Sequence, residues 1–383
     1  MFTHSLRRVL LLVCLLVTVG AYLQAQSNFK LKYKNSSVYG GIDVGAKGVK
    51  LSILEIGNNA RKNGAFNVLK DTAINTDFIS FTETSFQNTL NGLYKLYSLA
   101  IKDYNISPDR VFILVSSGIK VQAEKAEKTS WVKNLVDSFK ILSNEPARKI
   151  PMIDVKEEAR LSHLGIVPDL RRYSTFLIDI GSGNTKGGYF PYGNTKDFKL
   201  FQLTWGTKSV ANATDKRLED DNSLINFNKQ LQRVIAGEAN SEITYAINVS
   251  GAYNMNDNIA FSGGIAWSVA TLMYPELVDN SIVGVTYEDV VKFGEKLFRE
   301  YPSLSDTEIV KSLHDKTLDK KAITSEVKRV HQVFDQKSLM AGTALLLKIM
   351  RQFESIYAKK QFFLVKSGQV GWISAYVDQT IGK

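Results

Sequence analysis

The sequence has almost no cysteine. Cys14 is the single one among 383 residues, and it lies in an apolar run near the N-terminus that we expect to be removed. The mature chain would then carry none, which excludes disulfides, thiol nucleophiles and thiolate metal sites. The four histidines are not spaced as metal ligands usually are.

Long low-complexity tracts and dense basic clusters are also missing. A chain of 383 residues with a hydrophobic share of 44% is expected to be globular, with room for two domains. Its net charge of +10, from 48 basic and 38 acidic residues, favours anionic partners, although a basic protein with no such partner is an equal alternative. Because no basic cluster is interleaved with aromatic residues, nucleic acid is not expected as a partner.

Residues 1–25 have the pattern of a secretory signal peptide. Arg7 and Arg8 precede an apolar run over residues 9–20, and Ala25 supplies a small residue for cleavage. An uncleaved anchor is the alternative, but the run is short for a membrane span. Cleavage leaves 46 − 38 = +8 charges. We expect an exported protein, periplasmic or secreted, with no stable membrane span and with a polar arm over residues 26–37.

Two glycine-flanked aspartate turns are the most informative feature of the chain. Asp43 lies in residues 40–50 and Asp179 in residues 176–188, each within an apolar strand, an Asp-x-Gly turn and a second strand. A carboxylate at the end of a strand can hold a hydrated cation or a water, and glycines let backbone N–H groups approach an anion. One such turn is also an ordinary hairpin sequence. Two of them predict a duplicated fold that holds a phosphate between its halves.

Strands and helices are expected along the whole chain after residue 37. Residues 38–56 form two predicted strands, and further strands are predicted over 110–117, 174–180, 198–203, 259–261 and 362–365. Helices are predicted over 86–104, 134–142, 155–164, 286–298 and 338–353. This mixture indicates the α/β class. A boundary within residues 168–173 would give domains of 38–170 and 171–383, with one aspartate turn in each.

A set of landmarks carries a resemblance to a known family. Besides the two aspartate turns they are residues 116–120 (Ser-Ser-Gly-Ile-Lys), 155–161 (Val-Lys-Glu-Glu-Ala-Arg-Leu), 203–207 (Leu-Thr-Trp-Gly-Thr), 262–264 (Ser-Gly-Gly) and 367–371 (Ser-Gly-Gln-Val-Gly). In this order they resemble the exopolyphosphatase/guanosine-pentaphosphate phosphatase (Ppx/GppA) family of the actin-like, sugar-kinase and chaperone-ATPase superfamily. The resemblance implies two actin-like (ribonuclease H-like) domains around a central phosphate-binding cleft.

The resemblance also implies an activity and its catalytic residues. The protein would release terminal phosphate from polyphosphate or a nucleotide polyphosphate. Glu158 would be the base that activates water, with Glu157 as second choice. The plain alternative is that both form a solvated helix face with Arg160. Asp43 and Asp179 would hold Mg²⁺ or its waters, unless each merely caps its own turn.

Phosphate contacts are implied for the two turns and for several lysines. The residues are Gly45, Lys47, Lys50, Lys120, Gly181, Ser182, Gly183, Asn184, Thr185, Lys208, Gly263 and Gly264. Any one of the lysines, taken alone, is more often a solvated surface residue. The Ser-Gly-Gly turn could equally be a plain helix entry.

Three positions depart from the family pattern. Lys186 stands where the family has a glutamate, Ala46 and Lys47 replace a more hydroxyl-rich turn, and Lys120 replaces an arginine and its bidentate geometry. Such a lysine-rich site suits hydrolysis of a long polyanion, with or without a metal. It equally suits a non-catalytic phosphate-binding pseudoenzyme of the same fold. Export disfavours a third alternative, a kinase or ATP-driven assembly protein. A monomer and a homodimer both stay open.

Overall fold

A computed structural model describes residues 29–46, 48–58, 60, 66–191, 193–354, 359–366 and 368–381. The predicted signal peptide, the first three residues of the polar arm, Lys47 and Ser367 lie outside the described residues. The described chain divides into two compact units, unit 1 ending at Met152 and unit 2 beginning at Ile153. The predicted boundary at 170/171 falls later in the sequence, after the helix that carries Glu158.

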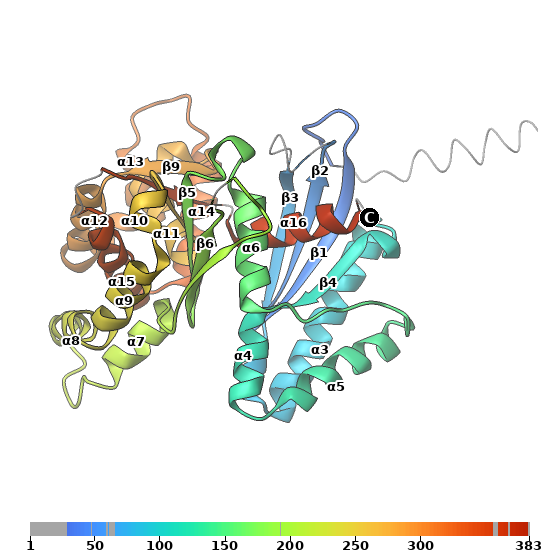
Figure 1. The fold of residues 1–383 in the computed structure, drawn as a ribbon. Helices are drawn as coiled ribbons and strands as arrows, with labels where there is room; N and C mark the ends of the chain where they lie inside the picture. The colour runs from blue at the N-terminus through green and yellow to red at the C-terminus, as the bar shows by residue number, and fades with distance from the viewer. Residues whose placement is uncertain are drawn as a thin grey trace, which may run out of the picture. The chain divides into compact units, whose positions relative to one another are not determined.

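Unit 1 is a four-stranded sheet with helices packed on it (Figure 1). Its strands lie in the order β3-β2-β1-β4, with β1 antiparallel to β2 and parallel to β4. The strands are β1 Ser37–Gly45, β2 Gly48–Ile56, β3 Phe66–Asn75 and β4 Val111–Val115, and the helices are α3 Glu83–Ser98, α4 Ser117–Lys125 and α5 Thr129–Leu142. A π-helical turn, η2 Leu99–Asp103, extends α3, and short 3₁₀ turns are η1 Phe78–Ser80 and η3 Pro108–Arg110.

The predicted elements of unit 1 are confirmed, with shifted ends. Helix α3 begins at Glu83 rather than at residue 86, because Thr82 caps it and exchanges hydrogen bonds with Ser85. Helix α5 begins five residues before the predicted start. The apolar residues of β1 and β2, such as Ile42, Val44 and Leu51, are fully or almost fully buried in the core of the unit. Strand β3 was not predicted, since most of its residues are only half-buried and no apolar run marks it.

The polar arm is held to the sheet of unit 1 by Glu55, which is itself fully buried on β2. Its carboxylate accepts hydrogen bonds from the backbone N–H groups of Lys32 and Tyr33, at 2.9 and 2.7 Å, and from the side chains of Ser36 and Asn67. Burial alone would raise the pKa of the Glu55 carboxyl, but these donated hydrogen bonds together lower it below its ordinary value. Part of the predicted arm is therefore fixed to the fold.

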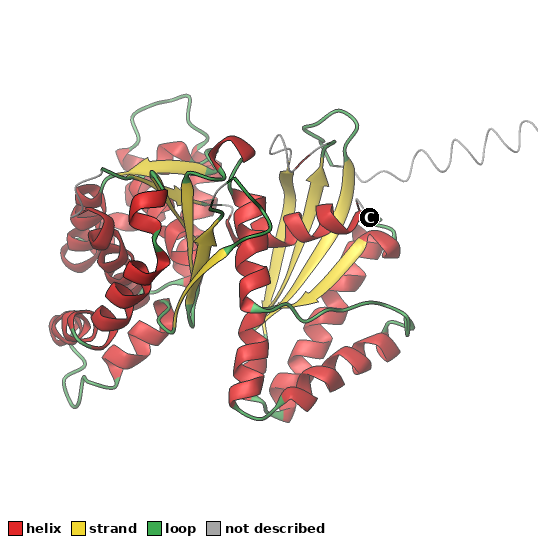
Figure 2. Ribbon diagram, viewed as in Figure 1, coloured by secondary structure: helices red, strands yellow, loops and turns green. Residues whose placement is uncertain are grey.

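Unit 2 contains a six-stranded sheet in the order β7-β6-β5-β8-β10-β9. Figure 2 draws strands in yellow and the helices beside them in red. The strands are β5 Thr175–Ile180, β6 Thr185–Tyr189, β7 Lys199–Leu203, β8 Asn258–Ser262, β9 Ile282–Val285 and β10 Gln361–Val365. As β1 does in unit 1, β5 runs antiparallel to the next strand in sequence and parallel to the strand on its other side. The four strands of unit 1 therefore correspond in order and direction to β7-β6-β5-β8 of unit 2, which is the predicted duplication within an α/β fold.

Most of the helices belong to unit 2. They are α6 Val155–Ile166, α7 Thr207–Asp215, α8 Leu224–Ala236, α9 Glu238–Ser250, α10 Ala252–Met255, α11 Gly264–Met273, α12 Tyr287–Arg299, α13 Asp306–Ser312, α14 Lys320–Val333, α15 Gln336–Glu354 and α16 Gly368–Ile381, with 3₁₀ turns at η4 Asp169–Arg171, η5 Pro275–Leu277 and η6 Tyr301–Leu304. The predicted capping box of α12 is present, since Thr286 and Asp289 exchange hydrogen bonds. Among the described residues, no helix is long and apolar enough to cross a membrane.

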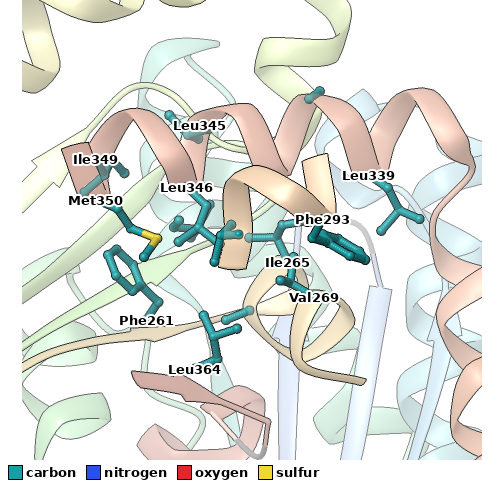
Figure 3. Close-up of a cluster of buried hydrophobic side chains, with 14 of the residues drawn as sticks. Phe261, Ile265, Val269, Phe293, Leu339, Leu345, Leu346, Ile349, Met350 and Leu364 are labelled. Atoms are coloured by element: carbon teal, nitrogen blue, oxygen red, sulfur yellow. The ribbon is translucent and has the colours of Figure 1, made fainter. Parts of the chain in front are cut away.

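The core of unit 2 is built around α11 and α15 (Figure 3). Ile265 and Val269 of α11 lie among Leu346 and Ile349 of α15, and all four side chains are fully buried. Phe261 on β8 and Leu364 on β10 join them from the sheet. This packing holds in place the sheet whose strands β5 and β6 carry the second aspartate turn.

Candidate functional site

The second aspartate turn is a hairpin between β5 and β6. Asp179 pairs in register with Lys186, and Ile180 with Thr185, which leaves residues 181–184 as the connecting loop. The loop rests on the start of α7, where the N–H groups of Thr207 and Lys208 donate to the carbonyls of Gly181 and Ser182, at 3.0 and 2.8 Å. Ser182 and Gly183 are exposed. A fixed loop thus presents polar groups to solvent, as a phosphate-binding loop must.

Two glycines let neighbouring segments approach this loop. Gly206 lies so close that a Cβ there would stand 2.6 Å from the backbone nitrogen of Asn184. Gly263 has a φ of +93°, and a Cβ there would collide with the Ile180 carbonyl and stand 2.7 Å from Oδ1 of Asp179. The predicted Ser-Gly-Gly turn therefore lies beside the predicted aspartate. Gly264, the next residue, faces the ring of Phe334.

Glu158 lies next to this hairpin and not in open solvent. Helix α6 begins where Asp154 accepts a hydrogen bond from the Glu157 N–H, at 2.7 Å, and it packs on β6 and α16. Gly165 allows the close approach of α16, since a Cβ there would collide with the Gly371 carbonyl. Only 4% of Glu158 is exposed. The helix is therefore held so that Glu158 points into protein.

Lys186 joins the two predicted carboxylates. Its Nζ lies 2.7 Å from Oε1 of Glu158 and 3.9 Å from Oδ2 of Asp179. All three side chains are largely shielded, with exposed fractions of 11% for Lys186, 5% for Glu158 and 21% for Asp179. At an effective dielectric constant of about 20, two unit charges 4 Å apart attract by about 4 kcal/mol, and the cost of desolvating them offsets much of that gain. The cluster is one connected charge network inside unit 2.

Glu157 has a different environment from Glu158. Its two carboxylate oxygens accept hydrogen bonds from Nε and Nη2 of Arg160, at 2.7 and 2.6 Å, and Arg160 also reaches Gln379 of α16. The Glu157 side chain is 39% exposed. The alternative of a solvated, ion-paired helix face is correct for Glu157 and Arg160. It does not describe Glu158.

The residues of unit 2 do not fit a divalent metal in this arrangement. The ammonium of Lys186 lies 3.9 Å from Oδ2 of Asp179, the predicted metal ligand of this unit, and 2.7 Å from Oε1 of Glu158, the predicted base beside it. A divalent cation beside them would face an unscreened like charge. No group of three or more histidine, cysteine, aspartate or glutamate side chains suited to a metal occurs among the described residues. For Asp179 to serve as the predicted Mg²⁺ ligand, Lys186 would therefore have to move away.

The first aspartate turn has the same register in unit 1. Asp43 pairs with Lys50 and Gly45 with Gly48, so β1 and β2 form the hairpin predicted from the sequence, while Lys47 at its tip lies outside the described residues. The predicted Ser-Ser-Gly segment lies beside this hairpin. A Cβ on Gly118 would stand 3.9 Å from the Ala46 Cβ. Helix α4 thus begins at the turn and carries the half-buried Lys120.

Three further side chains have defined positions. Thr185 is fully buried, and its hydroxyl donates to the Trp205 carbonyl at 2.7 Å. In this arrangement the hydroxyl proton is not available to a phosphate. Lys208 is exposed at the start of α7. His163 is buried between Phe190 and Phe198 and has Nε2 at 3.0 Å from the Thr175 carbonyl. Burial lowers the pKa of His163 to about 4, which keeps the ring neutral in the core.

In the sequence, Lys186 stands out only as a departure from the family pattern, and its partners Glu158 and Asp179 cannot be recognised. A signal was present, because Lys50 follows Asp43 by the same interval as Lys186 follows Asp179. The same register in the two hairpins then places each lysine directly across from its aspartate.

No family model matches the chain, and no curated protein is a significant match. Solved structures are similar to it. A Ppx/GppA family member from Aquifex aeolicus has a TM-score of 0.61 and 17% identity, covering 91% of this chain and 98% of that one. An exopolyphosphatase from Cytophaga hutchinsonii has a TM-score of 0.53 and 14% identity, covering 90% and 98%.

The chain shares the Ppx/GppA fold. A third structure, of an exopolyphosphatase-like protein, agrees with a TM-score of 0.56 and 16% identity, covering 90% of this chain and all of that one. The resemblance predicted from the ordered motifs is therefore confirmed for the fold. At identities this low, the likeness does not by itself carry an activity.

Proposed function

We propose that the protein is a phosphoanhydride hydrolase that releases terminal phosphate from polyphosphate or from a nucleotide polyphosphate. The observation that carries the proposal is the position of Glu158. Of two neighbouring glutamates on α6, it is the one that is buried and connected through Lys186 to the aspartate of the glycine-rich turn.

In the proposed reaction a water attacks the terminal phosphorus atom in line with the anhydride bond. The new P–O bond forms as the anhydride P–O bond breaks, and the shortened chain leaves with its oxygen negatively charged. Glu158 accepts the proton of the water and later returns it to solvent. Backbone and side-chain donors of the 181–184 loop, with the Lys186 ammonium, face the charge that develops on the phosphoryl oxygens.

The alternative is a phosphate-binding pseudoenzyme of the same fold. It is favoured by the hydrogen-bond distance of 2.7 Å between Lys186 and Glu158, because an ammonium held on the carboxylate weakens it as a base. We also propose export and action outside the cytoplasm. That proposal rests on residues 1–25, which lie outside the described residues.

The test is phosphate release from long-chain polyphosphate and from guanosine polyphosphates by residues 26–383. Glu158→Gln keeps the shape of the side chain and removes the base, so the rate should fall by about 10²- to 10⁴-fold. Glu157→Gln decides between the neighbouring glutamates and should cost far less. Glu295→Gln, on the exposed face of α12, controls for the loss of one carboxylate.

Turnover that survives Glu158→Gln unchanged would remove this residue from the reaction. Binding of tripolyphosphate without any turnover of polyphosphate or guanosine polyphosphates would leave the pseudoenzyme. Only variants whose circular dichroism spectrum matches that of the wild-type protein are compared in this test.

A further inference from the structure

The same charge pair recurs in the two hairpins. Asp43 opposes Lys50 between β1 and β2, and Asp179 opposes Lys186 between β5 and β6. Directly opposed residues of an antiparallel pair project to one face, with Cβ atoms about 4.5–5.5 Å apart. Since β1 and β5 occupy the same place in their sheets, each unit sets a lysine across from its turn aspartate.

In unit 2 the lysine is fixed in place. Its ammonium contacts Glu158 and lies within ion-pair distance of Asp179, and only 11% of the side chain is exposed. An ammonium offers three hydrogen-bond donors and one positive charge in a compact group. It therefore supplies, from inside the protein, the positive charge between two carboxylates that a divalent ion would otherwise supply.

We propose that Lys186 is a resident cation that makes divalent metal unnecessary at the aspartate turn of unit 2. Lys50, which is exposed, stands at the corresponding place across from Asp43 in unit 1. The ligand is then the free polyanionic phosphate chain and not its magnesium complex. The inference concerns the phosphate site of the proposed function and rests on that assignment. Magnesium competes with the Lys186 ammonium for phosphate oxygens, so it weakens binding instead of supporting it.

The first measurement is metal binding, which does not depend on turnover. Loss of the free Mn²⁺ electron paramagnetic resonance signal is followed as protein is added. The wild-type chain should show no stoichiometric Mn²⁺ site. Lys186→Glu turns the cluster into three carboxylates and should create one such site. Lys229→Glu makes the same charge change on the exposed side of α8 and should create none.

The second measurement is tripolyphosphate binding by calorimetry. Wild-type protein should bind in EDTA and lose at least tenfold in affinity when Mg²⁺ is added in excess over the ligand. Lys186→Glu should bind at least tenfold more weakly in EDTA, while Lys186→Arg, which keeps the charge, should retain most of the affinity and gain no Mn²⁺ site. Should Lys186→Glu fail to fold, the wild-type and Lys186→Arg measurements still decide.

A stoichiometric Mn²⁺ site in the wild-type chain that disappears in Asp179→Asn would overturn the inference. So would tripolyphosphate binding that requires Mg²⁺. Either result leaves the proposed hydrolase standing, now as a metal-dependent one. Conversely, tripolyphosphate binding in EDTA with no hydrolysis of any phosphate chain would refute the hydrolase and leave the resident cation in place.

Discussion

Replacing Lys186 with methionine removes the ammonium and keeps most of the apolar stem. Glu158 is then left as a charge that is only 4% exposed and has lost the cation 2.7 Å away. Breaking a buried ion pair from one side destabilises a protein by about 3–5 kcal/mol. We expect a loss of that size in the stability of unit 2 at neutral pH.

The partner substitution should cost less. In Glu158→Gln the ammonium keeps Asp179 at 3.9 Å as a counter-charge, so no buried charge is stranded. The double variant, with both charges gone, should be more stable than Lys186→Met alone. The coupling energy from the full cycle should reach on the order of 2 kcal/mol, as for residues in one ion-pair network.

The assay is urea unfolding at pH 7.5, followed by tryptophan fluorescence. Of the four tryptophans, only Trp131 belongs to unit 1, whereas Trp205, Trp267 and Trp372 belong to unit 2. The signal therefore reports mainly on the unit that carries the ion pair. The ion pair would be refuted as a stabilising contact if Lys186→Met were as stable as wild type. It would also be refuted if the losses in unfolding free energy of the two single variants simply added in the double variant.

Other consequences of the structure can be measured separately. Burial holds the pKa of His163 at about 4, below its ordinary 6.5, so on acidification the unfolded chain takes up the proton first. The free energy of unfolding is therefore intact above pH 6.5 and should fall by about 2 kcal/mol by pH 5. His163→Gln should remove this loss from urea unfolding measured across that pH range. Gly263→Ala, at a φ of +93° beside Asp179, should cost at least about 1 kcal/mol in unfolding experiments and weaken tripolyphosphate binding measured by calorimetry. Glu55→Ala strands the donors of residues 32–36 and should expose them to limited proteolysis with unit 2 unchanged; an equally resistant variant would show that other contacts hold the arm.

The parts of the fold that could be predicted are those with strong local patterns. The hairpins around Asp43 and Asp179 could be predicted because an apolar strand leads into each glycine-rich turn and a second strand follows it. Strand β3 could not be predicted because each of its ten residues is half-buried or exposed and no long apolar run marks it. Helix α16 was missed because Gly368 and Gly371 are typical of a turn, whereas Gly371 here serves the close packing of α6 on α16.

The site was predicted as a set of residues but not as a set of interactions. The sequence favoured Glu158 over Glu157 only through a resemblance, and the difference in their environments depends on which side of α6 faces β6. The pairing of Lys186 with Glu158 joins residues from separate elements, so spacing along the chain could not reveal it. The register between Lys186 and Asp179 follows from loop length and could have been derived.

The anchoring of the arm by Glu55 has a mechanical consequence. Lys32, Tyr33 and Ser36 donate hydrogen bonds to one carboxylate, that of Glu55 near the end of the inner strand β2, and Asn67 donates to it as well. A tether attached ahead of residue 29 therefore pulls on β2, the strand that carries Lys50, and not on a loose end. Immobilising the protein through its N-terminus would load the first aspartate hairpin under force. Attachment points on α8 or α12 of unit 2 would leave that hairpin unstrained.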